Sequence, residues 1–230
     1  MNNIISWGIH FLSSLGAVVG FLALLAVWSN QIQEAFLWLM LAFLIDGIDG
    51  PLARKFNVKQ FTSNIEGDVL DHIVDYLNYV FVPVIIMYQF NMVPDQIKVF
   101  TAACILVVSC FTFSNKKLKT KDNYFQGFPA VWNVVMFYLY ILNTSEVVNL
   151  LILLGLSILT FVPIKFIHPF RVEEGRLVTL VVTIIWGLAS LVLLLGDHFI
   201  HFLDVIFWLW VISSIYFALI SFKESKFSKL

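Results

Sequence analysis

Eight long apolar segments recur along the chain, and short polar connections separate them. They cover roughly residues 5–28, 32–53, 68–90, 95–114, 127–143, 147–165, 175–196 and 199–222. An α-helix needs about 20 apolar residues to cross a bilayer, and repeated segments exclude a single cleaved signal peptide. The pattern therefore predicts an all-α integral membrane protein with about eight transmembrane helices.

Composition agrees with this prediction, since 60% of the residues are hydrophobic and 13% are charged. Soluble domains are about half apolar and about a quarter charged. The sequence contains no internal repeat, and the longest connections, 55–67 and 115–126, are too short to fold alone. We therefore expect residues 1–230 to form a single membrane domain. The net charge of −1 gives no support for nucleic acid as a partner, and none is expected.

Basic residues predict the topology of the helices. Of the 14 Lys and Arg residues, 13 lie in alternate connections or in the C-terminal tail, and Lys98 is the exception. Short loops rich in Lys and Arg stay in the cytoplasm. Both termini are therefore predicted to be cytoplasmic.

Carboxylates gather where the second apolar segment ends and the third begins. Asp46 and Asp49 are three residues apart, and Asp71 and Asp75 are four apart, so each pair shares one face of a helix. Ionisable residues inside a membrane segment suggest function, although Asp is also common at solvated helix ends. Four crowded carboxylates need protons or cations among them, and oxygen ligands favour Mg²⁺ or Mn²⁺. The role of Asp68, which can face the same way, stays open.

Small and basic residues accompany these carboxylates. Gly50 removes a side chain and lets a ligand or another backbone approach. Pro51 should bend or break the helix near residues 47–51. Arg54 has a planar guanidinium group that suits phosphate, and Ala53 beside it is small enough for a tight ligand pocket.

These two segments resemble the signature of the CDP-alcohol phosphotransferases, D-x-x-D-G-x-x-A-R followed by a spacer and G-x-x-x-D-x-x-x-D. The fixed positions are all matched, by Asp46, Asp49, Gly50, Ala53, Arg54, Gly67, Asp71 and Asp75. The spacer between Arg54 and Gly67 is longer than usual in this family.

The resemblance implies a role for each matched residue. Two divalent ions, Mn²⁺ or Mg²⁺, would be bound by Asp46, Asp49, Asp71 and Asp75, and Asp75 would also be the general base. The CDP-diacylglycerol nucleotide would be framed by Asp49, Gly50, Ala53, Arg54 and Gly67.

Two later stretches, "FQGFPAVWN" at 125–133 and "VPIKFIHPFR" at 162–171, resemble bacterial members of the family that use choline as the acceptor. The resemblance implies that CDP-diacylglycerol and choline react to form phosphatidylcholine and CMP. It further implies a homodimer surrounded by lipids in the bacterial inner membrane. Because the connection between the two carboxylate segments is basic, the active site is expected to face the cytoplasm. Direct displacement is expected, because the motif contains no Ser, Cys or His nucleophile at a fixed position.

The quaternary ammonium of choline has no N–H, so proteins usually bind it with aromatic faces. Tyr79 lies four residues after Asp75 on the carboxylate face, and Tyr76 and Trp132 are further candidates. These rings could equally be packing or interfacial residues. Lys165 and Arg171 could bind the phosphates of the lipid nucleotide or could be topology determinants.

Two other functions stay open from the sequence. A member of the same family could use serine, inositol or glycerol phosphate as the acceptor. The protein could also be a transporter that uses carboxylates within its membrane segments. Two observations speak against this alternative: the sequence has no inverted repeat, and the acidic residues lie at the ends of the apolar segments.

Overall fold

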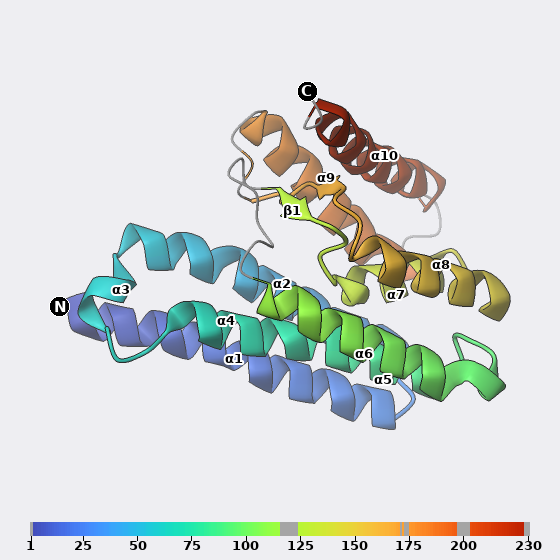
Figure 1. The fold of residues 1–230 in the computed structure, drawn as a ribbon, viewed down its shortest axis with the longest axis horizontal. Helices are drawn as coiled ribbons and strands as arrows, with labels where there is room; N and C mark the ends of the chain where they lie inside the picture. Colours follow the sequence, from blue (N-terminus) through green and yellow to red (C-terminus); the bar gives the residue numbers. More distant parts are fainter. Residues whose placement is uncertain (1, 116–123, 171, 173–174, 197–202, 228–230) are drawn as a thin grey trace. The chain divides into compact units, whose positions relative to one another are not determined.

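The computed structural model describes residues 2–115, 124–170, 172, 175–196 and 203–227. These residues are almost entirely helical (Figure 1), so the predicted all-α class is confirmed. Six helical runs within these ranges are long and apolar enough to cross a membrane. They are α1 (Asn2–Trp28), α2 (Ile32–Lys55), α4–η1–α5 (Gly67–Gln89), η2–α6 (Asp95–Ser114), α9 (Arg176–Leu194) and α10 (Leu203–Phe227).

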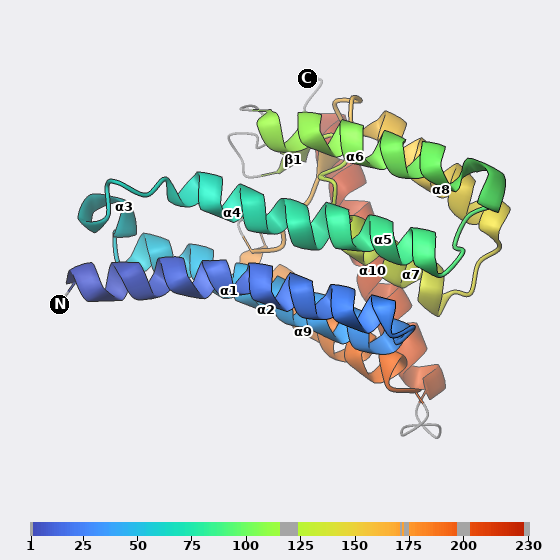
Figure 2. The ribbon, with the colours of Figure 1, turned by 90° about the horizontal axis from the view of Figure 1, so that it is seen from below.

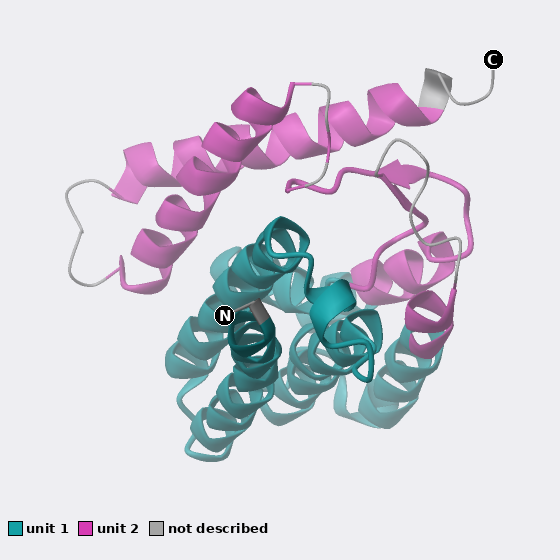
Figure 3. Ribbon diagram, turned by 90° about the vertical axis from the view of Figure 1, so that its left-hand side faces the viewer, with its two compact units in different colours: residues 1–109, 131–150 teal, residues 110–130, 151–230 magenta. Residues whose placement is uncertain are grey.

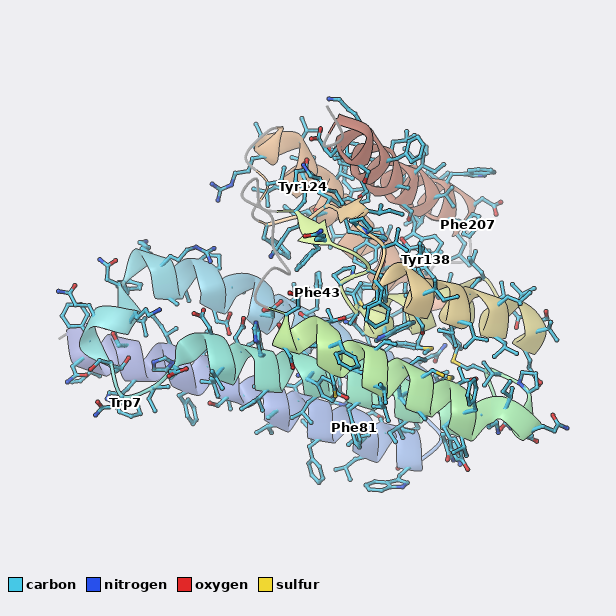
Figure 4. All side chains as sticks on the ribbon, viewed as in Figure 1. Trp7, Phe43, Phe81, Tyr124, Tyr138 and Phe207 are labelled. Atoms are coloured by element: carbon cyan, nitrogen blue, oxygen red, sulfur yellow. The ribbon has the colours of Figure 1, made fainter. Side chains whose placement is uncertain are left out.

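Large apolar side chains on the outer faces of these helices are exposed. Trp7 (labelled in Figure 4) and Phe11 on α1 are 53% and 66% exposed, and Ile212 on α10 is 61% exposed. Contiguous apolar surface of this kind is typical of a membrane protein, because lipid rather than water covers it. The chain is therefore a multi-pass membrane protein.

The fifth and sixth apolar segments form shorter helices than predicted. The segments 127–143 and 147–165 correspond to α7 (Trp132–Ile141) and α8 (Glu146–Leu159), which have 10 and 14 residues. Before α7, Gly127 and Ala130 have φ angles of 81° and 57°, which no α-helix accommodates. After α8, Pro163 interrupts the chain, which then enters a short strand. Local backbone geometry thus shortens both helices although the residues are apolar.

The chain packs as two compact units (Figure 3). The first unit comprises residues 1–109 and 131–150, and the second comprises residues 110–130 and 151–230. In the first unit, α1 lies along α2 and along the run formed by α4 (Gly67–Tyr76), η1 (Leu77–Phe81) and α5 (Val82–Gln89), as Figure 2 shows. The short helix α3 (Val58–Phe61) lies between α2 and α4 in the sequence.

The second unit combines α9 and α10 with a small antiparallel sheet of β1 (Phe125–Gln126) and β2 (Lys165–Phe166). Side-chain hydroxyls of α10 accept hydrogen bonds from the backbone of this segment, Ser225 from Lys165 N at 2.8 Å and Ser221 from Ile167 N at 3.0 Å. The hydrogen bond between Thr179 and Tyr216, at 2.9 Å, joins α9 to α10.

Lys98, the one basic residue outside the predicted cytoplasmic set, is largely buried in the first unit. Its ammonium contacts the Asp95 carboxylate and the Asn91 side-chain oxygen, and it lies 5.4 Å from the centroid of the Tyr88 ring. The positive charge is therefore neutralised locally, within the turn that connects α5 to α6.

Close packing of α1 against the continuous run of α4 and η1 depends on two glycines of α1. The Asn78 side chain is 2% exposed, and its Nδ2 donates to Gly16 O at 3.0 Å and to Val74 O at 3.1 Å. A Cβ at Gly20 would lie 2.5 Å from Asn78 Oδ1, and one at Gly16 would lie 2.5 Å from Val74 Cγ1. Only glycine lets the two helices approach this closely.

We expect Gly20→Ala to destabilise the protein by about 1–3 kcal/mol, because the added methyl would displace Asn78 from its hydrogen bonds. Thermal unfolding of the purified protein in detergent measures the effect. Gly8→Ala is the matched control on the same helix, because nothing lies within 4 Å of a Cβ there. Equal melting temperatures for the two variants would contradict this account of the packing.

Candidate metal and nucleotide site

A pocket with about 270 Å³ of empty space, including its open mouth, lies within the first unit. Its walls come from α1, α2, α4 and η1. The lining residues are Ser13, Gly16, Ala42, Ile45, Asp46, Asp49, Asp71, Val74, Asp75, Asn78 and Tyr79. The four aspartates of the sequence motif therefore open into one pocket.

Three of these carboxylates lie closest together. Asp46, Asp49 and Asp71 each offer an oxygen, and these oxygens all lie within 4.8 Å of one another. Asp75 lines the same pocket but is outside this closest group. The i, i+3 pair of α2, Asp46 and Asp49, thus meets Asp71 of α4.

This set of donors fits a divalent cation. Negative charges this close repel one another strongly in a poorly solvated site unless a cation or a proton lies among them. The donors are all carboxylate oxygens, which suit Mg²⁺ or Mn²⁺ better than thiophilic metals. The three aspartates could therefore hold a metal ion.

Asp49 is the most buried of the four motif aspartates. It is 5% exposed, and Ser13 of α1 lines the pocket with it. The Arg54 guanidinium also interacts electrostatically with this carboxylate. A Cβ at Gly50 would lie 3.4 Å from Arg54 Nη1, so the absence of a side chain leaves room for the arginine.

Of the two effects predicted for Pro51, a bend or a break of the helix, the break does not occur. The helix continues to Lys55, and Phe56 N still donates to Leu52 O at 3.0 Å. Proline removes only the hydrogen bond to the carbonyl four residues earlier, and the helical hydrogen bonds resume at once. Arg54 consequently stays on the same helix as Asp46 and Asp49.

Tyr79 lies in the pocket, and its hydroxyl donates to Asp46 Oδ2 at 2.6 Å. The side chain is 6% exposed, and its ring lies 6.2 Å from the Phe43 ring of α2. Phe43 is labelled in Figure 4. Tyr79 belongs to η1, a π-helical turn that follows α4 directly, and such turns are frequent at functional sites.

The other two predicted choline-binding residues do not line this pocket. The Tyr76 hydroxyl donates to Leu106 O at 3.1 Å. Trp132 is fully buried, and its indole N–H donates to Ser109 Oγ at 2.8 Å. Both polar groups are therefore used in packing of the first unit.

The remaining predicted nucleotide residues are placed as follows. Ala53 is half-buried on α2, whereas Gly67 is exposed at the start of α4, where a Cβ would lie 3.3 Å from His10 Cε1. Lys165 belongs to the second unit, with its ammonium 5.6 Å from the centroid of the Tyr124 ring. Arg171 lies outside the described residues.

Sequence reasoning missed the contribution of α1. Ser13 and Gly16 line the pocket, and one turn earlier His10 Nε2 hydrogen-bonds to Thr62 Oγ1 at 2.8 Å. The stripe of His10, Ser13, Gly16 and Gly20 has helical spacing, which was an available signal. Asn78, three residues after Asp75, was also missed.

Comparison with known proteins agrees with the motif. Residues 8–163 match the family model described as CDP-alcohol phosphatidyltransferase. The chain is 42% identical to a protein of Pseudomonas aeruginosa called phosphatidylcholine synthase, over 95% of this chain and 91% of that one. Proteins of the same name from Mesorhizobium japonicum and Rhizobium meliloti are 39% and 37% identical, over 79% and 83% of this chain and 68% and 79% of theirs.

The match extends over more than half of the chain and includes the whole aspartate pocket. The Pseudomonas aeruginosa protein is similar over nearly the full length of this chain. This chain belongs to the CDP-alcohol phosphatidyltransferase family.

Proposed function

We propose that this protein transfers the phosphatidyl group of CDP-diacylglycerol to choline and releases CMP, which is the reaction of a phosphatidylcholine synthase. The observation that carries the proposal is the convergence of Asp46, Asp49 and Asp71. It occurs in a chain 42% identical, over 95% of its length, to a protein of that name. Phosphoryl transfer needs mainly positioning and neutralisation of charge, and this pocket offers both.

The metal site would consist of Asp46, Asp49 and Asp71, with Asp75 as a further ligand from the same pocket. When bound, two Mg²⁺ or Mn²⁺ ions would neutralise charge on the diphosphate and on the leaving CMP. Arg54, whose guanidinium interacts with the Asp49 carboxylate, would contact the diphosphate. Gly50, Ala53 and Gly67 would leave room for the nucleotide.

Asp75 would be the general base. Its carboxylate would accept the proton of the choline hydroxyl while the choline oxygen forms a bond to the β-phosphorus. The bond from that phosphorus to the bridging oxygen would break at the same time, and CMP would leave with the electron pair. None of the residues that line the pocket is a Cys or His, and the hydroxyl of Ser13 donates to the backbone oxygen of Ile9 rather than to a base, which supports direct displacement.

Three further elements of the proposal concern phosphate binding, topology and assembly. Lys165 and Arg171 are proposed phosphate ligands because their side chains are cationic. The pocket would face the cytoplasm of a bacterial inner membrane, because the predicted cytoplasmic connections carry nearly all the basic residues. A homodimer is proposed from the family resemblance.

Purified protein in detergent should release CMP when it receives CDP-diacylglycerol, Mn²⁺ or Mg²⁺, and labelled choline. Serine, inositol and glycerol phosphate, each supplied alone, should yield no labelled lipid. Formation of a serine lipid would reassign the acceptor within the family. Absence of CMP with every alcohol would refute the enzymatic function.

Chelation of divalent ions should reduce activity to background, and added Mn²⁺ should restore it. Asp49→Asn and Asp71→Asn should each lower kcat/KM by at least about 100-fold, because each removes a charged metal ligand. Asp68→Asn is the control, since Asp68 is exposed and does not line the pocket. Normal turnover in an Asp49→Asn/Asp71→Asn double variant would exclude the proposed site.

Tyr79 is the proposed aromatic contact for choline, because it alone of the three predicted rings lines the pocket. Tyr79→Ala should raise the KM for choline by about tenfold, because a partly desolvated cation–π contact would be lost. Tyr79→Phe should preserve it, because the ring face remains. Steady-state kinetics with each substrate varied would test this, and equal increases for choline and CDP-diacylglycerol would contradict it.

A further inference from the structure

The hydroxyl of Tyr79 has a partner that recognition of the acceptor does not explain. It donates to Asp46 Oδ2 at 2.6 Å, which is within the short range of hydrogen bonds from a hydroxyl to a carboxylate. The direction is fixed by chemistry, because an ionised carboxylate only accepts. Since Tyr79 is 6% exposed, water competes little for this bond.

The ring of Tyr79 is itself held in position. It packs against Phe43 with the ring centroids 6.2 Å apart and the planes 52° apart. Asn78, the preceding residue, is fixed by hydrogen bonds from its Nδ2 to Gly16 O and Val74 O. Because Phe43 is three residues before Asp46 on α2, one helix supports the ring and supplies the carboxylate.

We infer that Tyr79 is a positioning residue, whose hydroxyl fixes the orientation of the Asp46 carboxylate for the divalent ion. A carboxylate on a short side chain can rotate, and a hydrogen bond to one oxygen restricts this rotation while leaving acceptor capacity for a cation. Partners of this kind typically change metal affinity by about 10–100-fold. The inference rests on the proposed metal-dependent function, and it assigns the hydroxyl of Tyr79 to the metal site and the ring face to choline.

Tyr79→Phe separates the two roles, because it removes the hydroxyl and keeps the ring against Phe43. We expect the Mn²⁺ concentration for half-maximal activity to rise by about tenfold, while the KM for choline changes less than about twofold. Mn²⁺ binding without substrates, followed by electron paramagnetic resonance, should show the same loss of affinity. Tyr216→Phe is the control. It also removes a hydroxyl hydrogen bond, the one to Thr179, and Tyr216 does not line the pocket.

A double-mutant cycle provides the second measurement. If the hydroxyl acts through Asp46, adding Tyr79→Phe to Asp46→Asn should cause no further loss of Mn²⁺ affinity. An unchanged Mn²⁺ affinity in Tyr79→Phe, or full additivity in the cycle, would overturn the inference. Neither result would affect the choline-dependent release of CMP by the unaltered protein, which tests the proposed function separately. A melting temperature equal to that of the unaltered protein verifies that Tyr79→Phe is folded.

Discussion

Repulsion between carboxylates in a largely apolar helical unit is the constraint on which the rest of the site depends. Asp46, Asp49 and Asp71 place oxygens within 4.8 Å of one another, and burial of Asp49 reduces the screening of its charge by water. This repulsion would push α2 and α4 apart if no other contact held these helices. The site therefore needs a cation among the carboxylates and a scaffold that resists their separation.

The scaffold is α1, a helix that carries no carboxylate. It contacts both α2 and α4, its Ser13 lines the pocket together with Asp49, and its Gly16 and Gly20 leave room for Val74 and Asn78. Packing of small residues is a strong means of association in lipid, where the hydrophobic effect between helices is absent. The helix without charge thus holds together the two helices that supply the charge.

The sequence could predict those features of the site that depend on spacing within a single helix. The carboxylate face followed from spacing within each helix, because three and four residues make nearly one turn. The contribution of Ser13 and Asn78 depends on which helices meet. The spacing of small and polar residues on α1 marks a face, but it does not say which helices pack against that face. Hydropathy also overestimated the length of the helices in segments 127–143 and 147–165. It does not register the positive φ angles of Gly127 and Ala130 or the effect of Pro163 on the backbone.

Tyr79 joins the two halves of the proposed reaction in one side chain. Its hydroxyl is bonded to a proposed metal ligand, while its ring belongs to the wall of the pocket that would receive the alcohol. Two divalent ions would balance four carboxylates, and the bound diphosphate would then make the site negative again. A quaternary ammonium is attracted to such a site, whereas an anionic alcohol would need additional cations. On these grounds the charge of the complete site favours choline as the acceptor once the nucleotide is bound.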